Sequence, residues 1–189
     1  MGVNLMSAFY YIKIGNCERQ LKLIKTEDFS YYSFNMLGDV ELNKESAKVL
    51  ANCLTEIDVI VTVESKAIAL AQEISSLLNH SRYVVIRKSK KSYMENEVSV
   101  FGKTIISGNV GYYLDGSDIN YLRGKRVAVV DDVISSGGTI DAIYRLLDKV
   151  SLNISLFSCV LCEGKQIKEF QGIPVISHGF IPFLEKDDD

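Results

Sequence analysis

Short apolar runs alternate with segments of helical periodicity along most of the chain. Runs without polar residues are typical of parallel strands buried on both faces, whereas apolar residues repeated every three or four positions indicate a helix with one buried face. Strands are predicted at residues 59–63, 82–87, 127–130, 154–161 and around Val175, and helices at residues 43–54, 66–78, 140–150 and 166–170. Because strands and helices alternate, the pattern predicts an α/β fold with a doubly wound, mostly parallel sheet.

Two parts of the chain depart from this alternation. Residues 9–14 and 18–24 are short strand patterns around Gly15-Asn16, which predicts a hairpin near the N-terminus. Residues 95–120 are polar and rich in glycine, and a loop of this length in a compact domain is usually a lid over a functional site. The acidic residues 185–189 are expected to form a disordered tail.

Composition narrows the class of protein. With 189 residues, 47% of them hydrophobic and 24% charged, the chain is expected to form a single domain with its own core. The net charge of −3 argues against a general nucleic-acid binder. Since no apolar stretch reaches transmembrane length and signal-peptide features are absent, a cytoplasmic protein with no membrane partner is expected. Cys159 and Cys162 lie in a predicted strand, where their side chains would point to opposite faces, so free buried thiols are expected rather than a metal site.

The segment 127–139 (VAVVDDVISSGGT) carries the clearest chemistry. Asp131 and Asp132 end a buried strand, at the crevice where open α/β sheets hold their ligands. Two adjacent carboxylates repel each other, so they suit a partner with several hydroxyls or a divalent cation. The turn that follows offers backbone N–H groups, small hydroxyls and a helix N-terminus, which together bind a phosphate monoester. Its residues are Ser135, Ser136, Gly137, Gly138 and Thr139. One segment therefore predicts a site for ribose 5-phosphate.

These residues resemble the signature of the type I phosphoribosyltransferases, which bind 5-phosphoribosyl 1-pyrophosphate. The resemblance implies that Asp131 and Asp132 are catalytic residues at the ribose hydroxyls and that the turn wraps the 5-phosphate. One departure is Ser136, where the family usually has Thr, and the hydroxyl is kept. Mg²⁺ is the implied cofactor, bound with the phosphoribosyl pyrophosphate and held by the protein at most indirectly, through Asp131.

A second turn, at residues 62–66, lies between a predicted strand and a predicted helix. In phosphoribosyltransferases the equivalent turn grips the pyrophosphate, often through a non-proline cis peptide that aims backbone N–H groups inward. Glu64, Ser65 and Lys66 take that place in this sequence. The resemblance therefore assigns these three residues to pyrophosphate.

Four cations leave the end of the predicted strand 82–87 together. Fixed cations stabilise the charge that develops on a leaving pyrophosphate. They are Arg87, Lys88, Lys90 and Lys91. The element is similar to the R-K-x-x-K element of adenine phosphoribosyltransferases, and the form followed by Tyr-Met matches an adenine phosphoribosyltransferase-like subgroup. The resemblance implies pyrophosphate binding by all four residues, with Arg87 and Lys91 catalytic.

In this family, the pocket for the base is formed by regions that vary among members. The resemblance implies a small hood over the base, formed by residues 1–40, and a flexible β-ribbon lid, formed by residues 95–120. Phe29, Tyr31 and Val133 are the candidate base-binding residues. Residues 162–164 (Cys-Glu-Gly) also fall close to the sheet edge that faces the base.

The implied function is a purine phosphoribosyltransferase with small-molecule substrates, namely phosphoribosyl pyrophosphate and a purine base. Adenine is the leading base. Adenine enzymes carry a Glu-Tyr-Gly triplet in the lid, whereas residues 100–102 of this chain are Val-Phe-Gly, so xanthine, hypoxanthine and guanine remain alternatives. A non-catalytic regulator that senses phosphoribosyl pyrophosphate or a nucleotide is an alternative from another class. Relatives act as homodimers, so a homodimer is expected.

Overall fold

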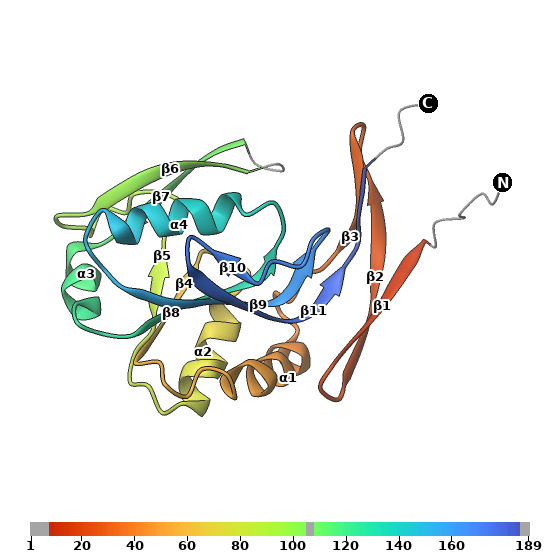
Figure 1. Cartoon of the computed structure of the whole chain (residues 1–189), viewed down its shortest axis with the longest axis horizontal. Helices are drawn as coiled ribbons and strands as arrows, with labels where there is room; N and C mark the ends of the chain where they lie inside the picture. The colour runs from red at the N-terminus through yellow and green to blue at the C-terminus, as the bar shows by residue number, and fades with distance from the viewer. Residues whose placement is uncertain (1–7, 105–107, 186–189) are drawn as a thin grey trace.

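The core of the computed structural model is a six-stranded sheet with the strand order β10-β11-β9-β8-β4-β5 (Figure 1). The structure describes residues 8–104 and 108–185. The strands are β4 (Val59–Val63), β5 (Val84–Ile86), β8 (Val127–Ile134), β9 (Ile154–Glu163), β10 (Glu169–Phe170) and β11 (Ile173–Ile181). All neighbours in this sheet are parallel except β10, which is antiparallel to β11.

Both faces of this sheet are covered, as a doubly wound fold requires. Helices α1 (Val40–Ala51) and α2 (Ile68–Leu77) lie on one side of the sheet, and α4 (Gly138–Asp148) lies on the other (Figure 1). Along β8, Val127 and Val129 pack with the α4 side, whereas Ala128 and Val130 pack with the α1 and α2 side. The apolar runs are thus buried on both faces, and the predicted fold class is confirmed.

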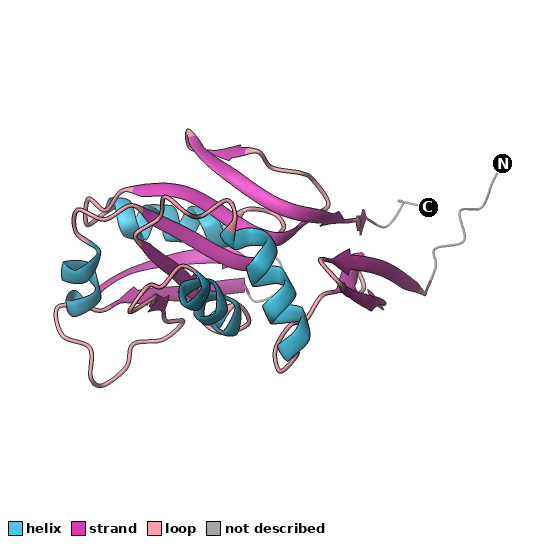
Figure 2. Ribbon diagram, turned by 90° about the horizontal axis from the view of Figure 1, so that it is seen from below, coloured by secondary structure: helices cyan, strands magenta, loops and turns pink. Residues whose placement is uncertain are grey.

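A second, antiparallel sheet forms one end of the molecule (Figures 1 and 2). Its order is β1-β2-β3-β12, with β1 (Phe9–Ile14), β2 (Cys17–Lys25), β3 (Phe29–Ser33) and β12 (Phe183–Glu185). We call it the hood sheet. The predicted hairpin is present as β1 and β2, and the predicted hood region supplies three of the four strands. The fourth comes from the other end of the chain and was not predicted. Of the expected tail 185–189, Glu185 is instead the last residue of β12, and residues 186–189 lie outside the described residues.

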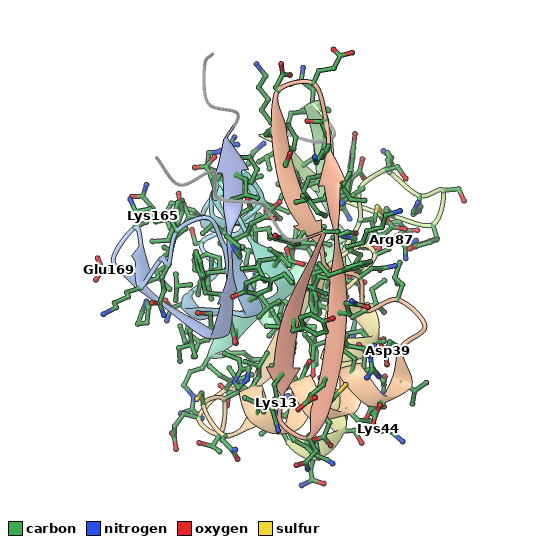
Figure 3. The ribbon with its side chains drawn as sticks, turned by 90° about the vertical axis from the view of Figure 1, so that its right-hand side faces the viewer. Lys13, Asp39, Lys44, Arg87, Lys165 and Glu169 are labelled. Carbon is green, nitrogen blue, oxygen red and sulfur yellow. The ribbon has the colours of Figure 1, made fainter. Side chains whose placement is uncertain are left out.

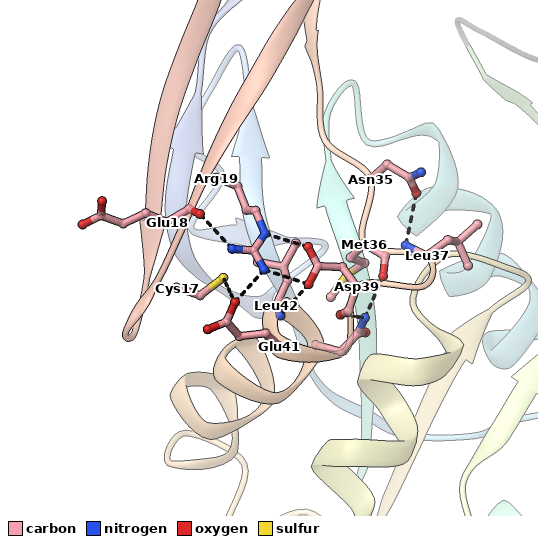
Figure 4. Close-up of polar contacts among 10 residues, drawn as sticks. Cys17, Glu18, Arg19, Asn35, Met36, Leu37, Asp39, Glu41 and Leu42 are labelled. Atoms are coloured by element: carbon pink, nitrogen blue, oxygen red, sulfur yellow. Dashed lines mark hydrogen bonds and ion pairs between the residues drawn. The ribbon is translucent and has the colours of Figure 1, made fainter.

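The hairpin is fixed to α1 by one arginine (Figure 4). Arg19 donates from Nε and Nη2 to the two carboxylate oxygens of Asp39, at 2.7 and 2.9 Å, and from Nη2 to Glu41 at 2.8 Å. Asp39 also accepts from the backbone N–H of Leu42 at 3.0 Å and so caps the N-terminus of α1. The helix predicted at residues 43–54 therefore begins and ends three residues earlier, at Val40 and Ala51. Asn43 lies inside the helix, and its side chain donates to the carbonyl oxygens of Met36 and Asp39.

The predicted lid contains a two-stranded ribbon and a helix. The ribbon consists of β6 (Val98–Thr104) and β7 (Gly108–Leu114), and helix α3 (Gly116–Leu122) follows it. Residues 105–107 lie outside the described residues. The ribbon runs over α4 (Figure 1), so close that a Cβ placed on Gly102 would lie 2.7 Å from the Cβ of Ala142. Tyr112 and Leu114 are fully buried. The inner part of the ribbon therefore belongs to the core, and the mobility of the lid stays a prediction.

The predicted helix at residues 166–170 is not formed. Residues Glu169 and Phe170 pair as β10 with β11 across the two-residue turn Gln171-Gly172. Both turn residues have positive φ, at +52° and +76°, which is the backbone of a tight hairpin turn. Phe170 packs edge-on against Phe157 at 5.9 Å, so a tertiary contact outweighs the weak local helix signal.

The prediction that the side chains of Cys159 and Cys162 point to opposite faces of the sheet is also wrong. The two sulfur atoms are 3.9 Å apart, and both side chains are buried on the α4 side of the sheet. The alternation of β9 breaks between them, since Val160 and Leu161 both pack on the opposite side. Cys159 and Cys162 are buried free thiols, as is Cys17, whereas Cys53 is free and exposed. The helices in the described ranges are all too short or too polar to span a lipid bilayer.

Candidate active site

A cavity of about 400 Å³ lies at the carboxyl ends of β4, β8 and β9, beside the hood sheet. Its wall includes every residue predicted for ribose 5-phosphate, every residue predicted for the base, and part of the set predicted for pyrophosphate. From these sets the lining residues are Asp131, Asp132, Ser135, Ser136, Gly137, Gly138 and Thr139, then Phe29, Tyr31 and Val133, then Glu64, Ser65, Lys66 and Lys88. Residues as far apart in the sequence as Phe29 and Thr139 thus meet in one cavity.

The two adjacent carboxylates are held in different surroundings. Asp131 accepts from the backbone N–H of Asp132 at 2.9 Å. Burial and the neighbouring Asp132 carboxylate raise the pKa of Asp131 well above its ordinary value. Asp132 is only 7% exposed, and its Oδ2 has no hydrogen-bond donor within the described ranges, although Lys66 Nζ lies 3.6 Å away. Because an unsatisfied buried acceptor is costly, this pair is suited to a ligand that brings hydroxyl donors.

The phosphate turn is formed by backbone geometry. Gly137 has φ +84°, a left-handed conformation that favours glycine, and α4 begins at the next residue. The five-residue turn lines the cavity and presents the N-terminus of this helix to it. Gly138 has no room for a side chain, since a Cβ there would lie 2.5 Å from the carbonyl oxygen of Lys103 in the ribbon. The ribbon therefore braces the turn from outside the cavity.

The second predicted turn has the backbone that the resemblance implied. The peptide bond between Glu64 and Ser65 is cis. Ser65 and Lys66 line the cavity, and the Lys66 ammonium lies 3.4 Å from the carbonyl oxygen of Phe34, at the border of the hood. Lys66 thereby places a cation between the carboxylate pair and the hood.

Most of the predicted cationic cluster is held away from the cavity. Arg87 donates from Nε and Nη2 to the two oxygens of Glu64, both at 3.2 Å, and Lys91 Nζ lies 3.9 Å from the same carboxylate. Lys90 forms an ion pair with Glu97. Burial would raise the pKa of Glu64, but the backbone N–H of Lys88 and the cations of Arg87 and Lys91 bring it below its ordinary value. Of the four predicted cations, only Lys88 lines the cavity, while the backbone of Arg87 pairs with Tyr113 of β7 and its side chain points outward at the margin of the view in Figure 3.

The hood side of the cavity is aromatic. Phe29 stacks on Phe183 with ring centroids 5.3 Å apart, and Tyr31 lies 5.9 Å from Phe29. All three rings line the cavity. Phe183 is a site residue that the sequence did not reveal, because a three-residue strand shows no periodicity. Glu163, in the segment expected to face the base, also lines the cavity.

This arrangement is that of an α/β protein that binds ligands at the carboxyl ends of parallel strands. The chain belongs to the phosphoribosyltransferase family, because the family model described as "Phosphoribosyl transferase domain" matches residues 39–176. The hypoxanthine/guanine phosphoribosyltransferase of Methanothermococcus okinawensis is 32% identical over 162 residues, which is 81% of this chain and 85% of that protein. The protein of the same name from Methanocaldococcus infernus is 32% identical, over 82% of this chain and 84% of that one.

Solved structures agree on the fold. The adenine phosphoribosyltransferase of Thermoanaerobacter pseudethanolicus superimposes with a TM-score of 0.69 at 21% identity, covering 85% of this chain and 95% of that one. The enzyme of Giardia lamblia in complex with 9-deazaadenine gives 0.67 at 17% identity, over 85% of this chain and 93% of that one. The chain therefore has the type I phosphoribosyltransferase fold.

Proposed function

We propose that this chain is a purine phosphoribosyltransferase. It transfers the phosphoribosyl group of 5-phosphoribosyl 1-pyrophosphate to a purine nitrogen and releases pyrophosphate. The observation that carries this proposal is the carboxylate pair Asp131 and Asp132, two residues before the glycine-rich turn, in the cavity that also holds Lys66. The diol, the 5-phosphate and the pyrophosphate each have a matching group in the wall of this cavity.

Catalysis in this proposal is positioning and stabilisation of the leaving group. Ser65, Lys66 and Lys88 are the groups nearest to the bound pyrophosphate, because they line the cavity. Arg87 and Lys91 act from behind Glu64, since that carboxylate holds them in the unliganded protein. Pyrophosphate competes with Glu64 for these two cations. The reaction needs no nucleophilic residue from the protein.

Mg²⁺ fits this site as a partner of the substrate. Among the described residues no group of three or more His, Cys, Asp or Glu side chains is placed to hold a metal ion. Magnesium is commonly bound through substrate phosphates, water and one or two carboxylates, so the ion would rest mainly on the pyrophosphate and ribose oxygens. Asp131 would hold it through water. The ion would neutralise charge on the leaving group.

The relatives favour hypoxanthine or guanine over adenine as the base. The curated relatives at 32% identity are hypoxanthine/guanine enzymes, whereas the adenine enzymes are similar in fold at 21% identity or less. The ribbon of this chain also has Val100-Phe101-Gly102 in place of the triplet of the adenine enzymes. We therefore propose a 6-oxopurine as the preferred base. The cytoplasmic location and the homodimer belong to the same proposal.

An assay of pyrophosphate release tests the proposal. Purified protein with Mg²⁺ and phosphoribosyl pyrophosphate is supplied in turn with hypoxanthine, guanine, xanthine and adenine. Pyrophosphate and the nucleoside monophosphate should form in equal amounts, fastest with hypoxanthine or guanine. Tight binding of phosphoribosyl pyrophosphate without release on any base would favour the regulator, and the fastest release with adenine would reverse the choice of base.

A further inference from the structure

Glu163 stands where the base end of the cavity meets the phosphate turn. It is the last residue of β9, and the residue before it pairs with Ile134 of β8, which directly precedes the turn. The residue after it is Gly164, whose added Cβ would lie 2.9 Å from the Cβ of Phe183. Glu163 therefore has the phosphate turn on one side and the aromatic part of the hood sheet on the other.

The other acids in the cavity wall already have partners. They are Glu64, Asp131 and Asp132. Glu64 is held by Arg87, Lys91 and the Lys88 backbone, Asp131 accepts from a backbone N–H, and Asp132 lies 3.6 Å from Lys66. Glu163 forms no ion pair with any residue that the structure describes, and it is half-buried.

The groups that face Glu163 have opposing effects. Burial raises the pKa of Glu163, and the negative charge of Asp132 adds to this. The hydroxyl of Ser135 and the cation of Lys66 act in the other direction, but the pKa stays above its ordinary value. A carboxylate with a raised pKa is a better proton acceptor near neutral pH than an ordinary glutamate.

The position of the ribose determines where the base must lie. With the diol at Asp131 and Asp132 and the 5-phosphate in the turn, C1′ faces the rest of the cavity, and the base extends from it towards the hood rings. Glu163 lines this same cavity, at the end of β9 beside the phosphate turn. The reaction also has a proton to remove, because a ring nitrogen of the purine gives up its hydrogen when the base becomes a nucleotide.

We propose that Glu163 is the general base of this reaction, which rests on the proposed function. As the ring nitrogen forms its bond to C1′, the bond from C1′ to the pyrophosphate oxygen breaks and its electron pair leaves with pyrophosphate. The proton of the purine N–H passes to a carboxylate oxygen of Glu163, and it leaves to solvent after the products dissociate. No oxidant or other co-reactant is needed.

The test compares Glu163→Gln and Glu163→Asp with the wild type across pH. The glutamine keeps the shape but cannot accept the proton, so kcat/KM should fall by roughly 10²- to 10⁴-fold, the range for loss of a general base. The acid limb of the pH profile should vanish in Glu163→Gln and persist at lower rate in Glu163→Asp. Since Asp131 in the same cavity also has a raised pKa, the assignment depends on the variants rather than on the wild-type profile.

Two controls separate chemistry from folding. Glu169→Gln makes the same change on β10, at the outer edge of the molecule (Figure 3), and should leave the rate unchanged. Calorimetry should show that Glu163→Gln binds phosphoribosyl pyrophosphate as the wild type does. An active wild type whose Glu163→Gln variant keeps its rate and acid limb, or loses phosphoribosyl pyrophosphate binding in proportion to its rate, would overturn the general base alone. A wild type that releases no pyrophosphate with any base would overturn the proposed function and this inference together.

Discussion

At the scale of single residues, the sequence revealed which side chains lie near one another but not which of them form ion pairs with one another. Asp131, Asp132 and the turn after them could be predicted because their spacing along the chain is itself the site. The assignment of Arg87 and Lys91 to pyrophosphate depended on their positive charge and on the resemblance to the R-K-x-x-K element, and the structure pairs both with Glu64. Ion pairing between separate loops is a property of the folded chain, so a run of cations in sequence cannot show which of them face the cavity.

The carboxylate pair should control affinity for phosphoribosyl pyrophosphate. Replacing both Asp131 and Asp132 with Asn keeps their shape but weakens the acceptors for the ribose diol. We expect the dissociation constant measured by calorimetry to rise by more than about tenfold, the scale of one hydrogen bond to a charged group. Asp148→Asn, an exposed change at the end of α4, is the matched control. Unchanged affinity in the double variant would contradict the assignment.

Arg87 should act on pyrophosphate and not on the nucleotide product. Arg87→Ala should lower turnover by roughly tenfold, because one charged contact to the leaving group is lost. A nucleoside monophosphate has no pyrophosphate, so its affinity should stay at the wild-type value. Steady-state kinetics and calorimetry on the same preparation check both parts, with the exposed Arg123→Ala as control. An equal loss of monophosphate affinity would count against this role.

At the scale of elements, long buried segments were predictable and short ones were not. The strands β4 and β8 are continuous apolar runs, so their pattern alone identifies them. Strands β10 and β12 have two and three residues, too few to show a period, and each exists because of a partner strand. The irregularity of β9 that brings Cys159 and Cys162 together is likewise set by packing on both faces of the sheet.

The backbone amides of the ribbon should differ in their rates of hydrogen exchange, slow at buried residues and fast at exposed ones. Tyr112 and Leu114 are fully buried, whereas Phe101 in the middle of β6 is 65% exposed and Lys103 is also exposed. We expect hydrogen exchange of the unliganded protein to be slow at the amides of Tyr112 and Leu114 and faster at those of Phe101 and Lys103, because local opening costs least where little surface is buried. Equal protection along the whole ribbon would argue against a lid.

The residues just before β4 and β8, Asp58 and Arg126, form an ion pair that should make stability depend on pH. Hydrogen bonds from the Arg126 side chain, and then from its backbone N–H, lower the pKa of Asp58 to about 2. Since the unfolded value is about 3.9, this contribution is complete above roughly pH 4 and is lost as the pH falls towards 2. Urea unfolding from pH 2 to 6 should show this loss in the wild type and less of it in Asp58→Asn. Asp28→Asn, an exposed change outside this pair, should retain the wild-type slope.

At the scale of the whole molecule, one cavity joins two sheets of different kinds. The parallel sheet supplies the residues that we propose bind the ribose and the phosphate, and the hood sheet supplies aromatic rings. The family resemblance predicted this division between the two sheets, because the signature segment 127–139 lies at the parallel sheet. The hood could be predicted only in outline, since its rings and its fourth strand depend on contacts between the two ends of the chain.

The outer edge of the hood sheet is where we expect two copies to meet. Strand β1 is the edge strand, and among its side chains Phe9 is 41% exposed and Tyr11 73% exposed. Exposed aromatic residues on an edge strand favour association. Sedimentation at micromolar concentration should give a dimer, and Tyr11→Glu should shift it towards monomer. A strict monomer with full activity would contradict the dimer.

The pairing of β12 with β3 also sets the order in which the site can be completed during synthesis. A ribosome delivers the chain from the N-terminus, so the carboxylate pair and the phosphate turn emerge some fifty residues before Phe183 meets Phe29. The pocket for the base is thus the last part of the site to exist. A nascent chain whose β12 is still inside the ribosome would have the residues proposed for the sugar phosphate but no closed pocket for the acceptor base. Such a chain would bind phosphoribosyl pyrophosphate without transferring its phosphoribosyl group.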